Sequence, residues 1–271
     1  MGKTRTRLAV VVGFFLLCVG SATWAHSNLG GDGWDLQFTP YFWLAALDGD
    51  STLSGIAGSA ELDFSELWDF VDFGVSGRLE AWNGKWGLFF DGSYLDLGAE
   101  YTASVGPAAI DTEVDLRQTI LDFGLAYRLI QTPVGKDGTQ SLTLDSLGGL
   151  RYEYLKQEAE LNVAIGPFAP GTTLGGDEEW VEPFVGARLT WGVAETVAVV
   201  IRGDIGGFGI GSASDLTWNL LAGVDWQFRE NMALKAGYRI LDIDYERGSG
   251  TSAFGLDAQM KGPILGLAIY F

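Results

Sequence analysis

The 271-residue chain has a single cysteine, Cys18, and a single histidine, His26. One cysteine cannot form an intramolecular disulfide, and it is too few for a thiolate zinc site. One histidine near the N-terminus leaves the rest of the sequence without the side chain that most often acts as general base in enzymes. Disulfide-stapled folds and histidine-dependent catalysis are therefore excluded for the region after residue 26.

Basic residues are scarce as well, with 17 Lys and Arg against 35 Asp and Glu and a formal net charge of −18. So acidic a chain repels nucleic-acid phosphates and anionic membrane surfaces at long range. We expect no nucleic-acid partner, and the surplus of carboxylates favours cations instead.

Long apolar runs are absent except at the N-terminus, where Leu8–Val19 follows a basic head and precedes the small residue Ala25. This three-part plan predicts a signal peptide at residues 1–25, cleaved during export, and a mature domain at residues 26–271. The apolar run is shorter than the ~20 residues of a retained membrane helix. Cleavage removes Cys18 and takes Lys plus Arg from 17 to 14 against 35 acidic residues, a net charge of about −21.

Hydrophobicity in the mature domain comes as alternation, since no apolar run approaches the ~18 residues of a membrane-spanning helix. The even positions of 216–228 are apolar and the odd positions are largely polar, and 119–129 shows the same period of two. Such segments are strands with one apolar and one polar face.

The polar faces hold Arg and Asp or Glu in near balance, and aromatic residues gather near the expected strand ends. Those aromatic residues are Trp34, Trp86, Tyr127, Trp191, Trp226 and Phe271. A soluble sandwich also alternates, but its polar face is rich in Lys, Glu and Thr. A polar interior with aromatic girdles is the outer-membrane pattern. We therefore predict an all-β fold, a closed antiparallel transmembrane β-barrel in the outer membrane.

Ten strands are expected, at 34–46, 71–83, 85–100, 111–131, 141–162, 178–191, 195–206, 214–228, 232–246 and 256–271. An even count places both termini in the periplasm. The periplasmic turns are then 83–85, 132–140, 193–195 and 229–231, and the outer loops are 47–70, 101–110, 163–177, 207–213 and 247–255. Eight or twelve strands remain open, because 59–64 could also pair.

The C-terminus, GLAIYF, resembles the assembly signal of bacterial outer-membrane proteins. Gly266 is followed by alternating apolar residues, including Ile269, and by the terminal aromatic Phe271. Ile264 departs from the polar residue usual at its place. The resemblance implies recognition by the outer-membrane assembly machinery.

Four further segments resemble a group of uncharacterised small outer-membrane β-barrel proteins of Gram-negative bacteria. They are TPYFWLAALDGD (39–50), WVEPFVGARL (180–189), RGDIGGFGIGSASDLTWNLLAGVDWQF (202–228) and GYRILDIDYERGSG (237–250). This resemblance implies the fold and the location, and no activity.

Projecting the strands inward collects charges of both signs. They are Arg78, Glu80, Asp91, Asp122, Arg128, Arg151, Glu153, Glu182, Arg188, Arg202, Asp204, Asp225, Lys235 and Arg239, with Asp35 and Asp145. Charges shielded from lipid must pair, so one interpretation is a largely plugged lumen and a structural or surface-interaction role. The alternative is a narrow porin-like channel for small solutes or ions. Ten strands enclose only slightly more space than the eight that side chains fill, which favours the plug.

An enzyme is not expected. Outer-membrane barrels that are enzymes, such as omptin-like proteases, phospholipases and lipid A acyl-modifying barrels, mostly depend on a histidine base. His26 would stand at the new N-terminus, and no strand supplies another histidine. We expect no cofactor either.

The expected partners are outer-membrane lipid, lipopolysaccharide, the assembly machinery and divalent cations. Cations favour oxygen clusters such as the acidic rim, although no EF-hand spacing is present. The rim residues are Asp48, Asp50, Asp111, Glu113, Asp115, Asp177, Glu178, Glu179, Asp215 and Asp257. In the first outer loop, a Ser65 N-cap predicts a short amphipathic helix within 62–72, either folded over the mouth or dipping into the outer leaflet.

Overall fold

The computed structural model describes residues 33–53, 56–63, 65, 70–105, 108–135, 138–165, 171–250 and 253–271. The expected signal peptide, His26 and residues 64 and 66–69 of the expected loop helix lie outside these residues. No helix among the described residues is long and apolar enough to cross a membrane.

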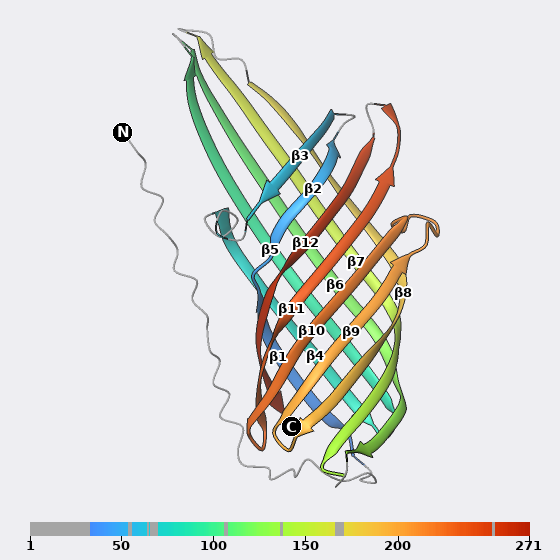
Figure 1. Ribbon diagram of the computed structural model, residues 1–271. Helices are drawn as coiled ribbons and strands as arrows, with labels where there is room; N and C mark the ends of the chain where they lie inside the picture. Colours follow the sequence, from blue (N-terminus) through green and yellow to red (C-terminus); the bar gives the residue numbers. More distant parts are fainter. Residues whose placement is uncertain are drawn as a thin grey trace.

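Strands make up nearly all of the described chain. They are β1 (Asp35–Trp43), β2 (Ala46–Leu53), β3 (Ile56–Leu62), β4 (Val71–Asn83), β5 (Trp86–Val105), β6 (Ala108–Val134), β7 (Gln140–Ile165), β8 (Gly171–Ala194), β9 (Val197–Gly207), β10 (Leu216–Arg229), β11 (Met232–Arg247) and β12 (Phe254–Tyr270). Each of β4 to β11 pairs antiparallel with the strand that follows it in sequence. β1 pairs with both β4 and β12, and this closes the sheet into a barrel (Figure 1).

The barrel has ten positions, as predicted, because β1 and β2 share one of them. β1 pairs with the C-terminal part of β12 and β2 with its N-terminal part. A Cβ at Gly262 of β12 would lie 2.0 Å from the Leu44 carbonyl oxygen, so only glycine allows the close approach at the junction of β1 and β2. β3 is an additional hairpin strand on β2, and it contains most of the 59–64 segment that was left open.

The parity expected for β10 agrees with the structure. Leu220 and Val224 are exposed on the exterior, whereas Asn219 is buried inside. An exterior of exposed aliphatic and aromatic side chains is what a lipid environment requires of a barrel. The six aromatic residues expected at strand ends all lie at the end with the short turns, where Trp86 packs edge-on against Tyr127 with ring centroids 4.7 Å apart.

The strand lengths expected at the other end were too short. β5 to β8 have 20, 27, 26 and 24 residues, against the ~9 to 11 that cross a bilayer, and they project far beyond the neighbouring strands (Figure 1). The expected loops 101–110 and 163–177 are therefore mostly strand. By contrast β9 has 11 residues, so the wall is low on that side.

The interior changes character along the barrel axis. Up to Arg239 the inward face of β11 is charged, but the next inward residues are Leu241, Ile243 and Tyr245, all at most 1% exposed. The same change occurs from Asp122 to Ile120 on β6. The expectation of a polar interior is therefore wrong for the half of the barrel beyond Asp122 and Arg239, which we call the outer half. There the apolar face of the strands turns inward, as in a soluble protein.

Candidate functional site

The centre of the inner lumen is Arg151 of β7, whose side chain is fully buried. Its Nε donates to Asp122 Oδ1 at 2.7 Å and its Nη2 to Asp204 Oδ1 at 2.8 Å. Its Nη1 lies 3.5 Å from Glu182 Oε1. One guanidinium thus joins four strands, β6 to β9, through the planar fork of donors that suits arginine for buried ion pairs.

Arg202 of β9 extends the cluster across the barrel. Its guanidinium lies 3.3 Å from Asp204 Oδ2, 3.4 Å from Asp122 Oδ2 and 3.7 Å from Asp91 Oδ2 of β5. Strands β5 and β9 are not neighbours in the sheet, so these side chains can meet only inside the barrel.

A second crossing contact lies nearer the turns. Arg188 of β8 donates through Nη1 to both carboxylate oxygens of Glu80 on β4, at 2.8 and 2.9 Å, and through Nη2 to Asp145 Oδ2 at 3.0 Å. This bidentate bond again links strands on opposite sides of the lumen.

Two further arginines complete the inner layer. Arg78 donates to Glu80 at 2.6 Å and to Asp91 at 2.9 Å, and Arg128 donates to Asp145 at 3.1 Å. Five carboxylates are therefore each shared by two arginines: Glu80, Asp91, Asp122, Asp145 and Asp204. We call the whole set the central ion-pair cluster: Arg78, Glu80, Asp91, Asp122, Arg128, Asp145, Arg151, Glu182, Arg188, Arg202 and Asp204.

Aromatic rings support the arginines of this cluster. Arg78 and Arg202 lie over the Phe89 ring, 4.6 and 5.5 Å from its centroid, and Arg128 and Arg188 lie over Trp82 at 4.3 and 5.5 Å. Such cation–π contacts fill space beside the guanidinium planes and keep the ion pairs packed.

Neutral side chains that were not among the predicted lumen residues donate to further carboxylate oxygens. Glu182 accepts hydrogen bonds from Ser214 and Thr217, and Asp204 accepts one from Asn219 at 2.8 Å. Thr217 and Asn219 lie on the polar face of the 216–228 alternation, so their position was visible in the sequence. Ser214 precedes that strand, and no pattern marks it.

Five of the predicted lumen residues lie outside the cluster: Asp35, Glu153, Asp225, Lys235 and Arg239. Lys235 pairs with Asp225 close to the turn end. Arg239 donates to Asn219 Oδ1 at 3.0 Å and stacks over the Trp43 ring at 4.5 Å, and within the described chain it has no carboxylate partner. Glu153 is 1% exposed, and its Oε1 accepts no hydrogen bond from the described residues. Asp35 is exposed at the turn end.

The cluster divides the cavities of the lumen. A polar cavity of about 430 Å³, the vestibule, opens at the turn end, and a second of about 110 Å³ reaches up to Arg202. On the other side of the cluster lies the outer cavity, of about 370 Å³, whose lining is largely apolar. Buried ion pairs therefore stand between the two ends of the barrel.

The predicted assembly-signal residues lie in the seam that closes the barrel. Gly266 is opposite Tyr41 of β1 and Lys235 of β11, and Ile269 is opposite Phe38. The side chain of Phe271 is exposed, and its backbone N–H donates to the Leu36 carbonyl at 2.9 Å. The terminal residue thus contributes both an apolar side chain and a bond of the seam.

Deleting Phe271 is expected to lower outer-membrane insertion several-fold while export continues, because the seam loses its last backbone bonds and the terminal aromatic. The amount of heat-modifiable protein in isolated outer membranes measures insertion. Phe271→Tyr keeps the backbone bonds and an aromatic ring and should insert normally. Normal insertion of the deletion variant would contradict an assembly role for the terminus.

Several acidic residues of the expected outer rim have partners within the chain. Glu178 pairs with Arg247 at 2.9 Å, Glu179 accepts a hydrogen bond from Tyr152 at 2.8 Å, and Asp48 lies 3.8 Å from Lys261. The described part of the chain contains no group of three or more His, Cys, Asp or Glu arranged to hold a metal. Divalent cations at the rim stay a prediction.

No protein-family model and no curated protein sequence matches the chain. Solved structures do match: the outer-membrane protease OmpT of Escherichia coli has 9% identity and a TM-score of 0.52, over 90% of this chain and 100% of its own. The translocator domain of the autotransporter NalP of Neisseria meningitidis has 14% identity and a TM-score of 0.38, over 89% and 90%. Ail, the attachment invasion locus protein of Yersinia pestis, has 12% identity and a TM-score of 0.28, over 89% and 100%.

Only the first of these TM-scores exceeds 0.5, and at 9% identity the likeness defines the fold alone. The fold is that of the small outer-membrane β-barrels of Gram-negative bacteria, with a buried salt-bridge network inside. The protease activity in the first title belongs to that protein.

Proposed function

We propose that this protein is a non-enzymatic outer-membrane barrel whose lumen is closed to ions and which acts at the cell surface through its outer half. The observation that supports closure is the central ion-pair cluster, where Arg151 and its three carboxylate partners are at most 6% exposed. An ion crossing this layer would have to separate buried, hydrogen-bonded charge pairs, which is costly in a low-dielectric interior.

The surface role is supported by the size of the outer half. A barrel that only spanned the membrane would need strands of ~9 to 11 residues, yet β6 and β7 have 27 and 26. Above the change of interior character, ten buried residues form a separate apolar core around Leu241, Ile243 and Tyr245. We infer that this outer half is a folded unit presented to the medium.

The proposal includes export with cleavage after Ala25, both termini in the periplasm and insertion by the assembly machinery. Lipopolysaccharide and outer-leaflet lipid would surround the base of the outer half, and its long strands would extend beyond them. Divalent cations would bind between its carboxylates and the lipid phosphates, because both offer the oxygen ligands that such cations take.

Planar-bilayer recordings of the refolded protein test closure. We expect no discrete conductance steps in concentrated KCl, since the vestibule ends below the cluster. Insertion is verified in the same preparation by heat-modifiable migration. Reproducible conductance steps with ion selectivity would contradict closure and support the alternative function of a narrow channel. The cavities of about 430 and 110 Å³ in the lumen favour that alternative.

A further inference from the structure

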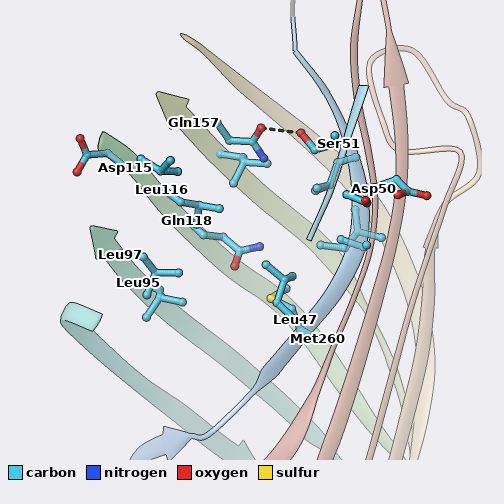
Figure 2. A pocket seen from close by; sticks show the side chains of 18 of the residues that line it. Leu47, Asp50, Ser51, Leu95, Leu97, Asp115, Leu116, Gln118, Gln157 and Met260 are labelled. Carbon is cyan, nitrogen blue, oxygen red and sulfur yellow. Dashed lines mark hydrogen bonds between the residues drawn. The ribbon is translucent and has the colours of Figure 1, made fainter. Parts of the chain in front are cut away.

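The outer cavity is a preformed apolar space within the barrel. Its volume of about 370 Å³ falls in the range of roughly 300 to 1,000 Å³ typical of small-molecule sites. Side chains from both sides of the barrel converge on it (Figure 2): Leu47, Leu95, Leu116, Leu155, Ile243 and Met260. A concave apolar space of this size is suited to a small-molecule ligand.

Contacts between strands on opposite walls of the barrel border this cavity. Ser51 of β2 donates to Gln157 of β7 at 2.8 Å above the cavity (Figure 2). On one side, where β9 and β10 are short, Trp180 of β8 stacks on Tyr245 of β11 with ring centroids 4.1 Å apart. The central ion-pair cluster lies below. The cavity therefore has a floor, a closed side and a partly bridged top.

The remaining side has a split in the barrel wall. The β1–β4 ladder ends at Pro40 and Gly77, and beyond it β1 turns to β12 alone. In the described part of the chain, residues 71–76 of β4 pair only with β5. The exterior at the split is apolar, with Phe42 43% and Val75 55% exposed, so lipid chains would contact it.

A smaller cavity joins the split to the outer cavity. It measures about 100 Å³ and is lined by Phe42 and Val75 on the outside and by Ile120 on the inside. Leu95, Gln118 and Met260 line both cavities, so the two are adjacent. This arrangement gives an apolar route from the lipid-facing exterior into the lumen.

We propose that the outer cavity binds an uncharged single-chain amphiphile that enters from the outer leaflet through the split between β1 and β4. The apolar lining takes the alkyl chain, and the Gln118 amide, which lies among the lining side chains in Figure 2, offers hydrogen bonds to a neutral head group. The net charge of −18 disfavours an anionic head by long-range repulsion.

This inference goes beyond the proposed surface role. It is independent of closure as well, because the outer cavity lies on the far side of the cluster from the vestibule. A conducting barrel could still bind the amphiphile, and a closed barrel could fail to bind it, so the two proposals fail separately.

Photolabelling in lipid nanodiscs tests the site, with dodecanol that carries a diazirine as the probe. We expect saturable labelling of cavity-lining residues on β5, β6 and β12, located by mass spectrometry. Excess dodecanol should compete at least tenfold more effectively than dodecanoate, and sucrose should not compete.

Two tryptophan variants on the same strand provide the matched comparison. Leu116→Trp fills the cavity and should lower saturable labelling at least tenfold, whereas Leu125→Trp, on the lipid-facing side, should stay within twofold of the wild type. Leu95→Trp fills the same space from β5 and replaces Leu116→Trp if that variant lacks heat-modifiable migration. Equal labelling in the cavity and lipid-facing variants, or labelling confined to lipid-facing residues, would overturn the proposal. So would a cavity filled by the chain's own residues 64–69 in an experimental structure.

Discussion

Arg151→Ala is expected to lower the free energy of unfolding by about 3 to 5 kcal/mol, the cost of leaving buried charges without their partner. Arg151 is fully buried, and it bonds to Asp122 and Asp204 and approaches Glu182. Its removal takes the closest cation away from three carboxylates, and only Asp122 and Asp204 keep Arg202 as a partner. Urea unfolding of the refolded barrel in lipid vesicles, followed by tryptophan fluorescence, measures the loss.

Arg117→Ala is the control for this substitution. Arg117 is also paired with an aspartate, Asp96 at 3.2 Å, but its side chain is 49% exposed, so the free energy of unfolding should stay close to that of the wild type. Arg151→Ala combined with Asp122→Ala should be less destabilising than the sum of the two single losses, because each single change leaves a charge unpaired. Equal losses for Arg151→Ala and Arg117→Ala would mean that water fills the inner lumen.

The number of strands and the direction of their faces could be predicted because alternation in a barrel wall is under strict physical control. A shift of one residue would expose Asn219 to lipid and bury Leu220, so the pattern of β10 specifies its own register. The projecting parts of β5 to β8 were harder to predict because their hydrophobicity is low. Strands in water do not need the apolar exterior face that marks a lipid-facing strand.

The apolar outer half could not be predicted, because a period of two does not reveal which face points inward. In β11 the large apolar residues occupy even positions up to Ile240 and odd positions from Leu241, and the alternation alone does not say that this change of phase marks an apolar interior. Only the distance from the membrane determines that the side of β11 with Leu241 and Ile243 faces the interior there. The split in the wall was hidden for a similar reason, since the sequence around Pro40 shows no loss of strand character.

The ion pairs themselves depend on contacts between distant strands. Arg188 and Glu80 are 108 residues apart in sequence, and β8 and β4 are not neighbours in the sheet. The alternation identifies which charged residues face inward, but their ion-pair partners depend on the width and shear of the closed barrel. The same holds for Asn219, which bridges Arg239 and Asp204.

The combined change Arg188→Ala and Arg202→Ala is expected to convert the closed barrel into a cation-selective leak with a lower melting temperature. Both guanidinium groups line the cavity of about 110 Å³, and Arg188 also lines the vestibule. Their loss joins these spaces and leaves Glu80, Asp91 and Asp122 short of positive charge. Water and cations would enter, because uncompensated carboxylates attract counter-ions.

Thermal melting and planar-bilayer recordings on the same variants measure the two effects. The melting temperature should fall by about 10 °C or more, which corresponds to the cost of broken buried pairs in a domain of this size. Lys235→Ala removes a cation whose side chain is 28% exposed at the vestibule, and it should leave the barrel closed and nearly as stable. A wild-type barrel that already conducts, with the double variant altering only selectivity and shifting the melting temperature little, would show a water-filled lumen. In that case salt and water would screen the charges that Arg188 and Arg202 leave behind, and the ion pairs would line a pore instead of closing it.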